Sequence, residues 1–74
     1  MTVLVRCYAG RKADERPVWF QLGDREYAVE EVLDRWYGLN ATFFKVRADD
    51  GNLYILEHTD ATDEWTLKSF RRLA

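Results

Sequence analysis

The chain has 74 residues, of which 47% are hydrophobic and 15% aromatic, and its formal net charge is −2. This length predicts one domain, residues 1–74, with a single core and little area left for a deep active-site cleft. The single cysteine, Cys7, excludes an internal disulfide, and with no apolar leader at the N-terminus it predicts a cytoplasmic protein. No run approaches the roughly 18 apolar residues of a membrane span, so we expect no membrane partner.

The chain opens with a strand pattern and a tight hairpin. Apolar and polar residues alternate over 2–8, which predicts a first strand. After a polar loop, 18–22 and 25–29 flank Gly23-Asp24. A two-residue loop that begins with glycine suits a type II′ turn, because its first position needs a positive φ. The register that this turn sets places five apolar side chains on one face: Val18, Phe20, Leu22, Tyr27 and Val29.

A second hairpin follows in 43–58, around Asp49-Asp50-Gly51. A three-residue loop that ends in glycine fits a type I turn with a G1 bulge. In this register Phe44 faces Leu56 and Val46 faces Tyr54 on one side of the hairpin. Residues 64–70 are the last predicted strand.

Residues 25–37 allow two interpretations. Val29, Val32, Leu33 and Trp36 have helical spacing, and Gly38 suits a helix C-cap, which predicts a helix over 29–37. The same segment can also form a bent strand, provided that a β-bulge near Glu30-Glu31 swaps its faces.

A resemblance favours the strand. Residues 26–35, followed by Phe44-Lys45-Val46, resemble the opening of a chromodomain, whose motif is Tyr-x-Val-Glu-x-Val/Ile-Leu-Asp and then an aromatic-x-apolar strand. The resemblance implies a bent, bulged strand in an SH3-like barrel. It also implies a methyl-lysine cage with Tyr27 at its first position, but Ala48 and Asp49 stand where the family has its corner tryptophan.

The frame of the whole chain is also similar to that of small uncharacterised bacterial β-domains. The residues that carry this similarity are Arg16-Pro17-Val18-Trp19-Phe20, Tyr27 to Val29, Val32 to Trp36, Phe44 to Val46, Asp50-Gly51, Tyr54 to Leu56 and Trp65 to Leu67. That group implies a fold and no activity.

These observations predict an all-β protein, a five- to six-stranded antiparallel SH3-like barrel or curled sheet with a bent, bulged strand at 25–37. The alternative is an α+β fold with a helix at 29–37. The expected core is Val3, Val5, Val18, Phe20, Tyr27, Val29, Leu33, Trp36, Phe44, Val46, Tyr54, Leu56, Trp65 and Leu67.

The inventory of reactive side chains predicts neither an enzyme nor a metal or cofactor site. His58, Cys7 and Ser69 are the only residues of their types, and no pattern brings them together as an activated nucleophile. Asp49 and Asp50 lack the alternating ligands of a calcium loop and suit turn chemistry instead. Zinc would need Cys and His clusters that the sequence does not contain.

The sequence predicts a non-enzymatic interaction module. Its predicted partner-binding residues lie on the second face of the 43–58 hairpin, with one exposed aromatic elsewhere: Phe43, Lys45, Arg47, Ile55 and Trp19. The partner would be another protein or a second copy of the chain.

The alternative is a nucleic-acid-associated domain that uses basic residues near both ends of the chain, with Trp19 or Tyr8 stacking on a base. These basic residues are Arg6, Arg11, Lys12, Arg16, Lys68, Arg71 and Arg72. The sequence pI of about 5.3 disfavours this alternative, since nucleic-acid-binding domains are normally basic.

Overall fold

The computed structural model describes residues 2–8 and 16–73. These residues form six antiparallel strands that close into a small barrel in chain order. The strands are β1 (Thr2–Tyr8), β2 (Arg16–Leu22), β3 (Arg25–Gly38), β4 (Ala41–Ala48), β5 (Leu53–Thr59) and β6 (Glu64–Arg71). The predicted all-β, SH3-like class is therefore confirmed, and 29–37 is strand rather than helix.

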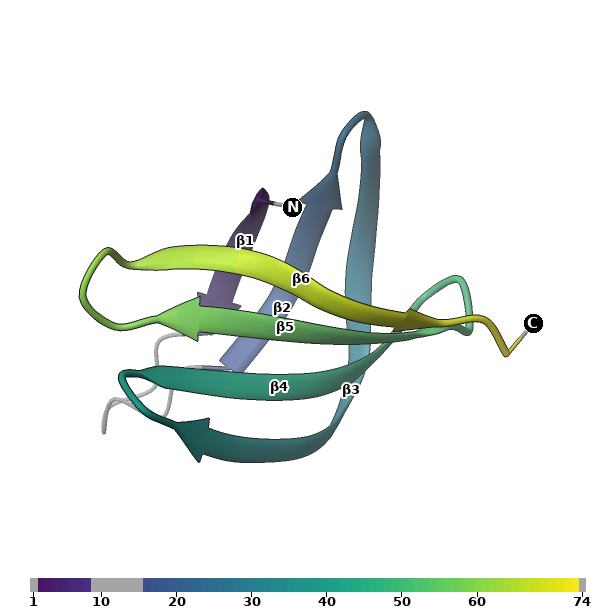
Figure 1. Cartoon of the computed structure of the whole chain (residues 1–74). Coiled ribbons are helices and arrows are strands. Elements are labelled where there is room, and N and C mark those ends of the chain that lie inside the picture. The colour runs from purple at the N-terminus through teal and green to yellow at the C-terminus, as the bar shows by residue number, and fades with distance from the viewer. Residues whose placement is uncertain (1, 9–15, 74) are drawn as a thin grey trace.

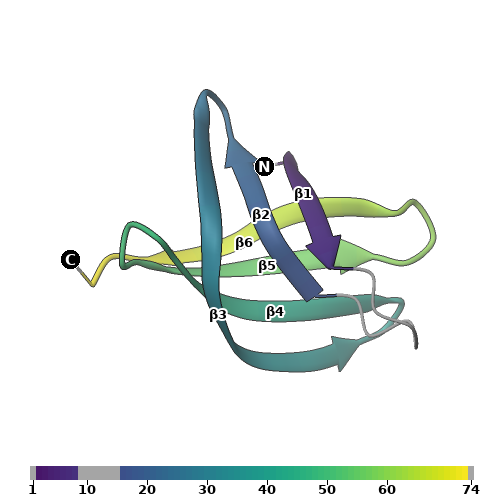
Figure 2. The ribbon, with the colours of Figure 1, turned by 180° about the vertical axis from the view of Figure 1, so that it is seen from behind.

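The barrel consists of two layers that share β3. β1 pairs with β2, and β2 pairs with the first part of β3, whereas β4, β5 and β6 continue from its second part. The two groups of strands cross at a steep angle, and β3 bends from one group into the other (Figure 1; Figure 2 from behind). The ring closes where Thr2 and Val3 of β1 pair with Thr66 and Trp65 of β6.

The β2–β3 hairpin has the predicted turn. Gly23 has φ 58°, and Leu22 pairs with Arg25 and Phe20 with Tyr27. The prediction that Val18 faces the core is wrong. Arg6 of β1 pairs with Trp19 and the next residue pairs with Pro17, so Val18 is the extra residue of a bulge and is 40% exposed.

β3 contains two bulges. Val29 pairs with Ala48 and Glu31 with Arg47, so Glu30 is an extra residue, as the bent-strand interpretation predicted. A second shift follows between Val32 and Asp34 and makes Leu33 an extra residue too. Each bulge reverses the alternation of side chains beyond it.

Because of the second bulge, two residues that were predicted to be in the core, Leu33 and Trp36, are not part of it. Leu33 is 39% exposed, and Trp36 lies on the outside of the barrel with 37% of its surface exposed. Arg35, which lies between Leu33 and Trp36 in the strand, is half-buried instead.

The β4–β5 hairpin has the predicted register, with Phe44 opposite Leu56 and Val46 opposite Tyr54. Gly51 has φ 84°, and its N–H donates to the carbonyl of Ala48 at 2.9 Å, as a type I turn with a G1 bulge requires. The alternation of this hairpin is unbroken, so every second residue of β4 from Phe44 onward is buried.

The core lies between the two layers. Its buried side chains are Val3, Phe20, Ala41, Phe44, Val46, Ala48, Tyr54 and Leu56, with Pro17 also fully buried. Partly buried residues pack against them: Val5, Leu22, Tyr27, Val29, Val32, Trp65 and Leu67. Nothing in the described part of the chain forms a helix long and apolar enough to cross a membrane.

Candidate binding surfaces

Three rows of side chains cross the outside of β3, β4, β5 and β6. We call these rows the outer face. Because the strands pair in register, each row is fixed by its cross-strand partners. The rows are Trp36–Phe43–Glu57–Thr66, Asp34–Lys45–Ile55–Ser69 and Glu31–Arg47–Leu53–Arg71. The outer face therefore contains four of the five predicted partner-binding residues and adds Trp36 and Arg71 to them.

Trp36 and Phe43 form a parallel stack at one end of the outer face. Their ring centroids are 5.5 Å apart and their planes differ by 4°. Gly38 leaves room for this stack, since a Cβ at that position would lie 2.8 Å from Cε1 of Phe43. Phe43, which was predicted to lie on an open surface, is half-buried. Its ring and that of Trp36 together form a two-ring apolar ridge.

A shallow groove lies beside this ridge. It has a volume of about 170 Å³ and is lined by Lys45, Leu53, Ile55, Ser69 and Arg71. Leu53 and Ile55 are half-buried and give it an apolar floor. Within residues 2–8 and 16–73, neither Lys45 nor Arg71 has an ion-pair partner, although Asp34 is the cross-strand neighbour of Lys45. Two cations therefore flank this floor.

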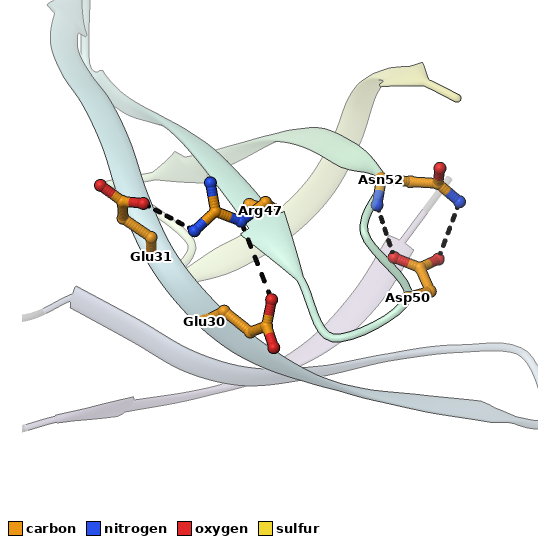
Figure 3. A network of polar contacts seen from close by, with 5 residues as sticks. All are labelled: Glu30, Glu31, Arg47, Asp50 and Asn52. Atoms are coloured by element: carbon orange, nitrogen blue, oxygen red, sulfur yellow. Dashed lines mark hydrogen bonds and ion pairs between the residues drawn. The ribbon is translucent and has the colours of Figure 1, made fainter. Parts of the chain in front are cut away.

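Arg47 differs from those two cations. Its guanidinium lies 2.8 Å from Glu31 Oε1 and 3.8 Å from Glu30 Oε1, and both carboxylates come from the first bulge of β3 (Figure 3). The bulge puts two consecutive glutamates within reach of one arginine. Arg47 thus ties β3 to β4 and is neutralised.

The fifth predicted partner-binding residue, Trp19, lies on the other layer. Arg6 of β1 is its cross-strand neighbour, and the guanidinium carbon lies 4.9 Å from the centroid of the indole. Arg16 and Tyr8 form the same kind of pair at 5.0 Å. The outside of β1 and β2 therefore carries two stacked arginine–aromatic pairs.

The structure describes five of the seven predicted basic residues and does not bring these five into one patch. Arg11 and Lys12 lie outside the described residues. Lys68 lies 3.7 Å from Glu57 on β5. β1 and β6 are antiparallel, and their described residues pair at Val3–Trp65 and Thr2–Thr66 alone. From these pairs, the chain runs toward Tyr8 in one direction and toward Arg71 in the other.

A larger hollow of about 520 Å³ lies at the end of the barrel, between the tip of the β2–β3 hairpin and β6. Tyr27, Tyr54 and Phe70 line it, and these rings pack on one another with centroids 5.1 to 5.4 Å apart. Tyr27 also stacks on Phe20 at 5.1 Å. Tyr27 thus packs into the core, and its ring is engaged by other aromatics rather than arranged as one wall of an open cage.

Asp50 forms the polar rim of this hollow. Its carboxylate accepts a hydrogen bond from the Tyr54 hydroxyl at 2.6 Å. It also accepts hydrogen bonds from the backbone and side-chain nitrogens of Asn52, at 3.0 and 3.1 Å (Figure 3). Burial raises the pKa of Asp50, but these hydrogen bonds outweigh it and the net pKa is below 3.8. Burial, and then the bond to Asp50, raise the pKa of Tyr54. Asn52 also accepts a bond from the Leu73 N–H at 2.9 Å, which fixes the chain after β6.

His58 lies near the end of β5, at the opposite end of the barrel from the β4–β5 turn. Its Nε2 is 2.5 Å from Asp63 Oδ1, its Nδ1 is 3.6 Å from Asp60 Oδ1, and its ring packs on Trp65 at 4.8 Å. Cys7 pairs with Pro17 in the other layer. Among the described residues, no group of three His, Cys, Asp or Glu side chains could hold a metal ion.

Arg35 lies close to His58 and was missed by the sequence reasoning. It lines a hollow of about 220 Å³ with His58, Asp60 and Trp65, and its guanidinium carbon lies 5.0 Å from the centroid of Phe44. Only the second bulge of β3 turns it inward, and no sequence signal marks that bulge.

The geometry defines the class of this protein as a small six-stranded antiparallel β-barrel whose outer face carries an apolar groove flanked by two cations. No protein-family model, curated protein or solved structure matches the chain. The candidate surfaces therefore rest on the geometry alone.

Proposed function

We propose that the protein is a non-enzymatic interaction module that binds a partner protein through the outer face of β4, β5 and β6. The observation that carries the proposal is the groove between Lys45 and Arg71, in which two cations without ion-pair partners among the described residues flank an apolar floor. An apolar patch with a charged rim is the usual anatomy of a protein-binding surface.

The Trp36–Phe43 ridge supports the same function. Aromatic side chains supply much of the binding energy at protein interfaces, and both rings are already ordered by their stacking, so little entropy is lost on binding. The cations select a partner surface with acidic groups, because charge complementarity sets specificity and association rate. A second copy of the chain is also a candidate partner, since its own Glu30 and Glu31 supply acidic groups.

Two sets of variants test this function. Lys45→Glu with Arg71→Glu reverses both free cations and leaves the buried core untouched. Phe43→Ser with Ile55→Ser removes the apolar contacts. Both sets should abolish partner capture and any concentration-dependent self-association measured by sedimentation. The charge-reversed protein should keep the wild-type amide spectrum but unfold at a somewhat lower temperature, because Lys45→Glu places a second carboxylate opposite Asp34. An unchanged set of captured partners would refute the proposal, and so would association that survives both sets.

The stacked pairs on β1 and β2 favour a second candidate function, binding of single-stranded nucleic acid. Arg6 with Trp19 and Arg16 with Tyr8 combine cationic groups with aromatic rings, the two elements that contact phosphates and bases. Titration of labelled single-stranded DNA at two salt concentrations tests it, with Arg6→Gln and Trp19→Ala as the variants. Affinity should fall as salt rises, and no binding at micromolar protein would refute it.

A further inference from the structure

One edge of β6 is unpaired over most of the strand. On its other side, β6 pairs with β5 from Glu64 to Arg71. β1 covers only Trp65 and Thr66. Within the part of the chain that the structure describes, no strand lies beside 68–71 on that edge, and Figure 1 shows this half of β6 running away from β1 toward the C-terminus. Such an edge presents backbone N–H and C=O groups to an incoming strand.

The hollow at the end of the barrel opens beside this edge. Leu67 and Phe70 of β6 form one side of it, and Leu22 and Arg25 from the β2–β3 tip form the other. Phe70 packs on Tyr54 with centroids 5.1 Å apart, yet it is 48% exposed. An apolar side chain that entered the hollow would cover the exposed half of Phe70.

The charges around the edge are mainly positive. Arg25 and Arg72 line the hollow, and Lys68 and Arg71 are exposed on the strand, with Lys68 lying 3.7 Å from Glu57. The one acidic residue that lines the hollow among the described residues is Asp50, whose carboxylate already accepts three hydrogen bonds. These charges fit an acidic segment.

The same charges disfavour a second copy of the chain at this edge. An antiparallel pair of two β6 strands, centred between Ser69 and Phe70, would set Lys68 of each copy opposite Arg71 of the other. Like charges in directly opposed positions destabilise a strand pair.

We propose that the β6 edge at 68–71 binds an extended acidic peptide segment of a partner protein by β-strand addition. Backbone hydrogen bonds to β6 hold the segment, and one of its apolar side chains enters the hollow against Phe70. This site uses the free backbone edge of β6 and the hollow at the barrel end, and it shares only the β6 residues Ser69 and Arg71 with the outer face.

Selection from a short-peptide display library identifies a probe, which is then synthesised and titrated into isotope-labelled protein. The enriched peptides should combine Asp or Glu with β-branched or aromatic residues. The titration should shift the backbone resonances of 67–72 and of the β2–β3 tip. Enrichment of basic peptides, no enrichment at all, or shifts confined to the outer face would overturn the proposal.

N-methylation of the probe separates strand addition from simple occupation of the hollow. Alternate amides of an added strand face β6 and the rest face solvent. One of two complementary N-methylated peptides should therefore lose binding and the other should keep it. Binding that survives both modifications would rule out strand addition.

Protein variants locate the site. Phe70→Ser and, separately, Arg25→Glu should each weaken probe binding about tenfold or more. Both residues lie outside the buried core, and an unchanged amide spectrum for the free variants confirms the fold. Phe43→Ser is the matched control and should bind the probe as wild type does. If both test variants bound the probe with wild-type affinity, the hollow beside β6 would not be the binding site. That result would leave the proposed function of the outer face unchanged.

Discussion

Replacing Tyr54 with phenylalanine removes one hydroxyl that ties the barrel to its β4–β5 turn. That hydroxyl donates to Asp50 Oδ2 at 2.6 Å, whereas the ring itself is only 3% exposed and packs in the aromatic cluster. A hydrogen bond to a charged acceptor contributes about 1.5–3 kcal/mol, and solvent around the exposed Asp50 lowers this to about 1 kcal/mol. For a domain of this size, that loss lowers Tm by about 4–8 °C.

The effect depends on pH with a defined sign. The folded pKa of Asp50 lies below its ordinary value of 3.8, so the ionised carboxylate stabilises the folded state. That contribution is fully present above the unfolded pKa of about 3.9 and is lost as the pH falls through the folded pKa. Tyr54→Phe raises the folded pKa, so the wild type and the variant should differ most at neutral pH and converge in strong acid.

Urea unfolding followed by tryptophan fluorescence measures this difference at neutral pH and in strong acid. Tyr37→Phe is the matched control, because its ring is 72% exposed and loss of its hydroxyl should leave the unfolding free energy unchanged. A Tyr54→Phe loss of the same size at both pH values, or no loss at neutral pH, would refute the assigned role of the Asp50 bond.

Other substitutions test the packing and the surface. Leu56→Ala should lower the unfolding free energy measured in urea by about 2–5 kcal/mol, because the side chain is fully buried. Leu39→Ala is the control and should cost almost nothing, because Leu39 is 93% exposed. Equal losses in the two variants would contradict the core assignment. Gly38→Ala should displace the Phe43 ring and remove its ring-current shift on Trp36 in the NMR spectrum, and an unchanged shift would contradict the 2.8 Å approach. Arg47→Ala should lower stability by less than about 1 kcal/mol in low salt, since its ion pairs are exposed, and a larger loss would show a packing role.

The sequence predicts the two hairpins well because two independent signals agree there. At Gly23 and at Gly51 the turn needs a positive φ, and the register that each turn sets also aligns the apolar residues. The Lys45–Ile55 pair on the outer face follows directly from the second register. These local features need no knowledge of the rest of the fold.

The bent-strand interpretation predicts the bulge at Glu30, but the sequence does not predict the other two, because a bulge changes side-chain direction without a fixed residue signature. The extra residue in β2 is Val18 itself, and the extra residue Leu33 in β3 reverses the alternation before Trp36, so the predicted core wrongly includes these three residues. Arg71 joins Lys45 at the groove only through the register between β5 and β6, which itself shifts after Ile55. That register depends on long-range pairing, which no local pattern reports.

The central claim, that the outer face binds a protein partner, is tested most directly by a photo-crosslinking amino acid introduced in place of Lys45 in the growing cell. Illumination should give discrete adducts that disappear when Arg71→Glu is added, and the same probe in place of the exposed Leu39 should give none. Adducts that are identical at both positions, or that persist with Arg71→Glu, would contradict the account, and so would the absence of any adduct at position 45.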